Sequence, residues 1–215
     1  MPNGPQQTWS DEPAAVYHSF DMSSKKAVWV VIKGNGVLRE RIQAASEALA
    51  KARRASDEFG NALETAMVVL GWCEEGWGAV ASVAKGRVQE SVGYVQALMK
   101  IDQTGKEDKG QGEFRYDKLQ EMSRLADLIG EMELILGLAA RTVEDLGELY
   151  ERVRQRHRGK DIATATTVFL TRVKEIVRSL ETRRAQIASE GRRLENGRRL
   201  VSDTALGPCI RRATS

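Results

Sequence analysis

Three stretches of the chain repeat apolar residues at alternating steps of three and four. The most complete stretch runs from Met122 to Val153, and a second runs from Leu38 to Leu70. A third places Val173, Leu180, Ile187, Leu194 and Val201 seven residues apart. Spacing of this kind keeps one narrow apolar stripe of a helix facing a partner helix. The pattern therefore predicts long helices packed side by side, and it carries little information about chemistry.

The prolines and glycines set the expected ends of these helices. The four prolines lie at positions 2, 5, 13 and 208, so none interrupts a helix between residues 14 and 207. The pattern is broken by Gly71 and Gly76, by the polar segment 103–113 and by Gly159. We therefore expect helices at about 37–70, 78–101, 117–157 and 162–201. Short connections predict antiparallel neighbours, and hence an all-α fold: an elongated antiparallel four-helix bundle of long coiled-coil-like helices with a flexible N-terminal arm.

The two ends of the chain differ from the expected bundle at 37–201. Residues 1–36 are expected to form the flexible arm, and residues 202–215 a basic tail. Within the arm, Lys26–Ile32 (KAVWVVI) has the β-branched and aromatic residues typical of a strand. The sequence offers no evident partner strand. This segment therefore either pairs with another chain or packs as an apolar lead-in, and the sequence does not decide between the two.

The charge of the chain is unevenly distributed. Residues 1–150 hold 17 Lys and Arg against 23 Asp and Glu, whereas residues 151–215 hold 16 against 7. A basic segment thus follows an acidic body. Either the two attract each other inside one bundle, or the basic segment binds an anionic partner: nucleic acid, a membrane surface or an acidic protein.

The apolar stripe of the last helix thins where arginines accumulate. Beyond Leu180, alternate core positions hold Arg183, Glu190 and Gly197. We expect this half of the helix either to project beyond the bundle or to pack against another copy. The candidate surface for an anionic partner consists of Arg183, Arg184, Arg192, Arg193, Arg198 and Arg199. Aromatic residues for base stacking are absent after Phe169, which favours a duplex backbone or lipid headgroups over single strands.

A second candidate surface lies at residues 65–84 (TAMVVLGWCEEGWGAVASVA). Two apolar blocks flank Glu74 and Glu75, and Trp72 and Trp77 lie almost symmetrically about this acidic pair. As the tip of a helical hairpin, the segment either buries both indoles at the end of the bundle or inserts into a membrane, where tryptophan favours the interface.

Residues suited to catalysis or metal binding are sparse. His18 and His157 are far apart in the sequence, and neither has a cysteine or another histidine nearby, as a zinc site would need. No phosphate-binding loop is present, and the acidic residues of 117–157 lack the Glu-x-x-His pattern of a di-metal bundle. Two cysteines, Cys73 and Cys209, argue against a disulfide framework and favour a reducing setting. The sequence predicts no enzyme, no cofactor and no metal.

The function that the sequence favours is a non-enzymatic interaction or assembly protein, acting through helix packing and its arginine-rich C-terminal segment. The expected partner is another protein or a second copy. A rival prediction is a membrane-active, pore-forming-like bundle that inserts the 65–84 hairpin while its basic segment holds anionic lipid. Nucleic-acid backbone binding through the 162–201 helix is less favoured. Met1–Ser10 is polar, and no run of 18 apolar residues occurs, so we expect a cytoplasmic protein with at most a membrane-associated form.

Overall fold

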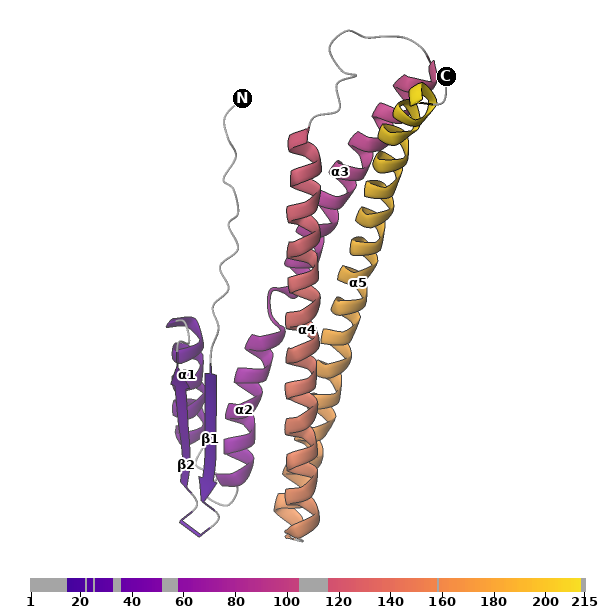
Figure 1. Cartoon of the computed structure of the whole chain (residues 1–215). Coiled ribbons are helices and arrows are strands. Elements are labelled where there is room, and N and C mark those ends of the chain that lie inside the picture. The colour runs from indigo at the N-terminus through magenta and orange to yellow at the C-terminus, as the bar shows by residue number, and fades with distance from the viewer. Residues whose placement is uncertain are drawn as a thin grey trace. The chain divides into compact units, whose positions relative to one another are not determined.

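The computed structural model describes residues 15–21, 23–24, 26–32, 36–51, 58–104, 116–157 and 159–213 (Figure 1). Side chains are described at these positions except at residues 50, 98–104, 116–117 and 202–213. The chain divides into two compact units. Unit 1 takes its described residues from 1–73 and 145–175, and unit 2 from 74–144 and 176–215.

Unit 1 begins with an antiparallel hairpin of β1 (Ala15–Asp21) and β2 (Lys26–Ile32). At its turn, the carboxylate of Asp21 accepts hydrogen bonds from the backbone N–H of Ser23 (2.9 Å) and from the hydroxyls of Ser23 (2.7 Å) and Ser24. Aspartate and serine commonly close turns in this way. These bonds hold the pKa of Asp21 well below its usual range.

The hairpin corrects the expectation for Lys26–Ile32. This segment is a strand, and its partner is Ala15–Asp21 of the same chain, so it is neither an apolar lead-in nor a strand that must find another chain. The sequence conceals the partner because AVYHSFD mixes polar and apolar residues without regular alternation. The expected flexible arm thus contains an ordered hairpin, while residues 1–14 lie outside the described part.

Five helices follow among the described residues. They are α1 (Gly36–Lys51), α2 (Glu58–Glu74), α3 (Trp77–Thr104), α4 (Tyr116–Arg156) and α5 (Lys160–Ala213). The predicted all-α helical-bundle class is confirmed. The region expected as one helix over 37–70 contains α1 and α2, and residues 52–57 between them lie outside the description.

The last helix is longer than expected. The sequence predicts an end near Val201, but α5 continues through Pro208 to Ala213. A proline removes one backbone hydrogen bond and crowds the preceding turn, which weakens a helix without necessarily ending it.

In unit 2, α3 runs parallel to the later part of α5. Gly78 near the start of α3 lies against the Arg183 guanidinium, and further along Val92 lies against Gly197. Because the contacts advance in the same direction on both helices, the two helices are parallel.

The first part of α4 runs antiparallel to the same stretch of α5. Met122 lies beside Gly197, and further along α4 Gly137 lies against Arg184. The partner on α5 therefore moves back toward its N-terminus as α4 advances. The described part of unit 2 thus contains three neighbouring helices in an up-down-up order.

The thinned stripe of α5 is filled inside unit 2. Its buried apolar residues beyond Leu180 are Ile187, Leu194 and Val201. A Cβ atom at Gly191 would lie 3.1 Å from Cγ2 of Ile129, and one at Gly197 would lie 3.1 Å from Cγ2 of Val92. Each glycine therefore leaves room for a side chain of a neighbouring helix. The expectation that this half projects beyond the bundle, or needs another copy to cover it, is wrong as far as Val201.

In unit 1, a row of aromatic rings joins the hairpin to three helices. Phe20 of β1 lies edge-on to Phe59 of α2, with ring centroids 5.3 Å apart. Phe59 lies 6.4 Å from the ring of Tyr150 on α4, which lies 4.7 Å from the ring of Phe169 on α5. Aromatic pairs at these separations add to the stabilisation from burial. The inner face of the hairpin is thereby fixed to the core of unit 1.

Candidate functional site

His18 lies where the hairpin meets α4. Its ring stacks on Trp29 of the neighbouring strand, with centroids 4.0 Å apart, and its Nδ1 lies 3.1 Å from the hydroxyl of Tyr150. Its Nε2 is buried and has no hydrogen-bond partner. Burial lowers the pKa of His18 and raises the pKa of Tyr150 to about 12. Both side chains are therefore held in their neutral forms, and their contact links the hairpin to α4.

The described residues contain no group of three or more His, Cys, Asp or Glu that could hold a metal ion. Cys73 is half-buried, and burial raises the pKa of its thiol. A raised pKa reduces the thiolate fraction and with it the reactivity of the sulfur.

The segment predicted as a hairpin tip contains a turn at Glu75 and Gly76, between the end of α2 at Glu74 and the start of α3 at Trp77. Gly76 has a φ of 85°, a left-handed conformation that glycine adopts without strain. Trp72 belongs to unit 1 and Trp77 to unit 2, and both are half-buried. In the part of the chain that is described, no helix has the length and apolar character needed to cross a membrane.

The six predicted arginines face different neighbours along α5. Arg183 is half-buried, lies over Gly78 of α3 and donates a hydrogen bond to Gln186 (3.1 Å). Arg184 lies over Gly137 of α4. A flat guanidinium covers the bare backbone of a glycine well, so these two arginines also serve packing. The structure does not bring all six together on one face.

Most of these arginines also have a carboxylate one turn earlier on the same helix. The ion pairs are Arg184–Glu181 (3.6 Å), Arg193–Glu190 (2.8 Å), Arg198–Glu195 (3.4 Å) and Arg199–Glu195 (3.9 Å). Ion pairs three or four residues apart on a helix contribute about 0.3–0.5 kcal/mol each when both side chains are exposed, as they are here except for the half-buried Glu190. Their main consequence here is partial local neutralisation of the positive charge that the sequence concentrates on α5.

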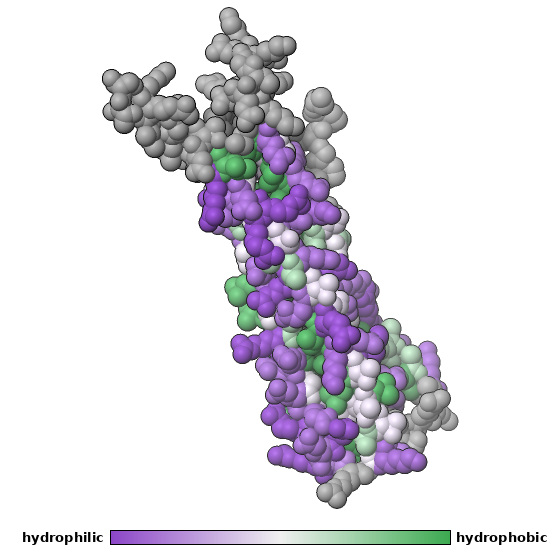
Figure 2. All heavy atoms as spheres, turned by 90° about the vertical axis from the view of Figure 1, so that its right-hand side faces the viewer, coloured by the Kyte–Doolittle hydropathy of each residue, from purple (hydrophilic) through white to green (hydrophobic). Residues whose placement is uncertain are grey.

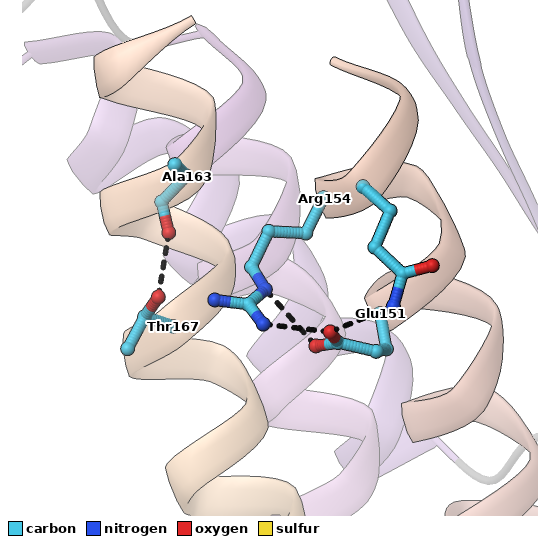
Figure 3. Close-up of polar contacts among 5 residues, drawn as sticks. Glu151, Arg154, Ala163 and Thr167 are labelled. Atoms are coloured by element: carbon cyan, nitrogen blue, oxygen red, sulfur yellow. Dashed lines mark hydrogen bonds and ion pairs between the residues drawn. The ribbon is translucent and has the colours of Figure 1, made fainter. Parts of the chain in front are cut away.

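The arginines at the end of α4 are arranged in a similar way. Glu151 accepts hydrogen bonds from Nε (3.0 Å) and Nη2 (2.6 Å) of Arg154, as Figure 3 shows, and a third from Gln155 (3.1 Å). The bonds from Arg154 are the main cause of a lowered pKa of Glu151. Nearby on α5, the Thr167 hydroxyl donates to the carbonyl of Ala163 (2.7 Å), a bond that stays within one helix. The polar groups drawn here bind one another and leave no prepared anion site.

Exposed apolar side chains form a more distinctive surface on the hairpin. The register pairs Tyr17 with Val30, and Val28 and Ile32 lie on the same side of the two-stranded sheet. Tyr17 is 61% exposed, Val28 54% and Ile32 57%. We call Tyr17, Val28, Val30 and Ile32 the outer hairpin face. The sequence alone does not reveal this face, because it does not show that Ala15–Asp21 pairs with Lys26–Ile32.

A smaller exposed apolar pair lies on α4. Leu134 is 62% exposed and Leu138, one turn later, is 57% exposed. Neither belongs to the buried stripe of α4, which runs through Ile129, Met132 and Leu136. This deviation from the stripe is visible in the sequence and was an available signal. Figure 2 shows a face of the molecule on which hydrophobic patches are separated by hydrophilic side chains.

Residues 2–95 match the family model of CorA-like transporters. This region contains the hairpin, α1, α2 and much of α3, and it is less than half of the chain. No curated protein and no solved structure matches the chain. The similarity to CorA-like transporters therefore concerns the N-terminal part, which carries the outer hairpin face.

Proposed function

We propose that this chain is a non-enzymatic interaction module of a transport-related assembly. Its helical bundle presents apolar surfaces that bind other proteins or further copies of the chain. The similarity of residues 2–95 to CorA-like transporters supports the connection with transport. The observation that carries the proposal is the outer hairpin face, because it lies inside the matched region and is exposed on an ordered element.

The two faces of the hairpin have different surroundings. The inner face packs through Phe20 against Phe59 and through His18 against Tyr150. These contacts hold the hairpin in place and do not use the side chains of its outer face. Fully burying a valine, leucine or aromatic side chain contributes about 1.5–3 kcal/mol. Four such side chains on a pre-ordered face offer a partner substantial binding energy at little cost in chain ordering. Tyrosine is also enriched at protein interfaces.

Site-specific photo-crosslinking in cells tests the proposal. A photoreactive phenylalanine analogue replaces Tyr17 in one variant and Ser46, an exposed residue of α1, in a control. We expect discrete crosslinked species at position 17, containing a second copy or a component of a transport system, and little crosslinking at position 46. Equal or absent crosslinking at the two positions would contradict the proposal.

Membrane association is the second candidate function. It is supported by the similarity to a family of transporters and by the half-buried Trp72 and Trp77 on either side of the turn. Co-sedimentation with anionic vesicles, compared between the wild type and a Trp72→Ala/Trp77→Ala variant, tests it. Binding that the variant loses would favour this function, whereas no binding at low salt would remove it. The ion pairs along α5 weaken the electrostatic basis for nucleic-acid binding.

A further inference from the structure

Four exposed residues follow one another on the outward side of α4 in unit 2. They are Glu131, Leu134, Leu138 and Arg141. Steps of three, four and three residues keep them on one side of a helix. The buried residues Met132, Leu136 and Ala140 lie on the opposite side. We call these four residues the outer α4 face.

The charged residues at its two ends have no partner among the described residues. Among the described residues, neither Glu131 nor Arg141 takes part in an ion pair or a side-chain hydrogen bond, and both are exposed. This distinguishes them from Arg193 and Arg198, whose guanidinium groups pair with carboxylates on their own helix. The outer α4 face therefore presents two unpaired opposite charges on either side of two exposed leucines.

The outer α4 face is complementary to a second copy of itself that runs in the opposite direction. If a second α4 lies antiparallel to the first, Leu134 of each copy comes level with Leu138 of the other. Glu131 of each copy then comes level with Arg141 of the other. Such a contact has two-fold symmetry, so every favourable pairing occurs twice. In a parallel arrangement Glu131 would meet Glu131 and Arg141 would meet Arg141, which is unfavourable.

We propose that the outer α4 face binds a second copy of this chain with the two α4 helices antiparallel. This inference rests on the proposed interaction function and names one partner for it. One helical turn beyond the ends of this face, Asp127 would lie level with Asp145 of the second copy. Repulsion between these two carboxylates confines the contact to residues 131–141. A contact of about three helical turns is small, and small interfaces give weak, reversible association.

A charge swap measured by sedimentation equilibrium of the full chain tests the proposal at low salt. Glu131→Arg alone, or Arg141→Glu alone, places like charges together and should raise the dimer dissociation constant about tenfold. The double variant Glu131→Arg/Arg141→Glu restores opposite charges and should recover most of the wild-type affinity. Within one chain the two residues are about 15 Å apart along the helix, so recovery cannot come from contact between them.

The leucines provide a second, independent test. Leu134→Gln/Leu138→Gln keeps good helix formers at exposed positions and should abolish the dimer. Val168→Gln alters a side chain that is 63% exposed on α5 and should leave the dimer unchanged. Circular dichroism checks that every variant remains helical.

The outcomes distinguish this inference from the proposed function. A wild-type chain that stays monomeric at all concentrations overturns the α4 dimer, whatever the crosslinking at Tyr17 shows. A wild-type dimer that ignores both the charge swap and the leucine substitutions also overturns it, because self-association then uses another surface. Crosslinking at Tyr17 can still support the interaction function in either case. Weakening by the single variants with recovery in the double variant supports the antiparallel contact.

Discussion

At the scale of single residues, His18 has an environment that its position in the sequence does not suggest. In sequence it is an isolated histidine within AVYHSFD. In the structure it stacks on Trp29, faces the Tyr150 hydroxyl and keeps Nε2 away from water. No charged side chain among the described residues makes an ion pair with it. The folded state therefore favours the neutral imidazole, and protonation should oppose folding.

Acid should accordingly weaken unit 1 through His18. The pKa of His18 is lowered in the folded state, so below its ordinary value of 6.5 the unfolded chain binds a proton that the folded chain does not. The stabilisation is complete above that pH and is lost as the pH falls through and below it, by up to about 1.4 kcal/mol per pH unit. Urea unfolding of the wild type, followed at a series of pH values from neutral to mildly acidic, measures this loss.

A paired substitution isolates the contribution of His18 from that of acidic groups such as Asp21. His18→Phe keeps a ring on Trp29, and Tyr150→Phe removes the hydroxyl that would otherwise lose its partner. The His18→Phe/Tyr150→Phe variant should show a shallower loss of stability between neutral and mildly acidic pH than the wild type does. Identical pH profiles for the two proteins would mean that His18 is not the titrating group.

At the scale of helices, glycines that look alike in the sequence have opposite surroundings. A Cβ at Gly86 of α3 would meet nothing within 4 Å, whereas one at Gly197 of α5 would lie 3.1 Å from Val92 and 3.5 Å from Met122. Interior glycines weaken a helix by about 0.5–1 kcal/mol relative to alanine. Only where the space is open can alanine recover that stability.

Gly86→Ala should therefore raise the free energy of unfolding by about 0.5–1 kcal/mol. Gly197→Ala should show no such gain, because the added methyl crowds Val92. Its free energy of unfolding should be lower than that of Gly86→Ala by about 1 kcal/mol or more. Urea denaturation of the two variants and the wild type under one condition provides the comparison. Equal stabilisation by both substitutions would show that α3 and α5 are less closely packed than these contacts indicate.

Some elements follow from the sequence pattern more directly than others. The 3-4 stripe of α4 predicted its buried side, and Met122, Ile129 and Leu136 are indeed buried. The close packing of α5 beyond Leu180 could not be predicted from the sequence. A glycine at a core position contributes no side chain, and the sequence does not show which side chain of a neighbouring helix occupies the space beside it. The hairpin was missed for a related reason: strand pairing is decided by a second segment, and Ala15–Asp21 carries only a weak pattern of its own.

The candidate surfaces were predictable to different degrees. The arginines of α5 are evident in the sequence, but their carboxylate partners one turn earlier determine how much charge remains free. The glutamates could have been noticed from spacing alone. Leu134 and Leu138 stand outside the stripe and are visible in the sequence. The outer hairpin face required the register between strands, which only the structure supplies.

At the scale of the whole molecule, the division into two units has a consequence for unfolding. Helices α4 and α5 contribute to both units, yet the hydrogen bonds of a helix join residues only four apart. One end of a long helix can therefore open while the other end stays folded. The core of unit 1 depends on Phe59 and the rings around it, and the core of unit 2 depends on residues such as Ile187. The two units should behave as separate cooperative regions.

Hydrogen exchange of core variants measures this separation. Phe59→Ala removes a ring that is 6% exposed, at a cost of about 3–5 kcal/mol. It should speed amide exchange in β1, β2 and α2 much more than in α3. Ile187→Ala, at a fully buried position, costs about 2–5 kcal/mol and should show the opposite preference, with faster exchange in α3 and little change in the hairpin. If each variant instead speeds exchange equally in all elements, the chain unfolds as one cooperative body and the contact-based division has no energetic counterpart.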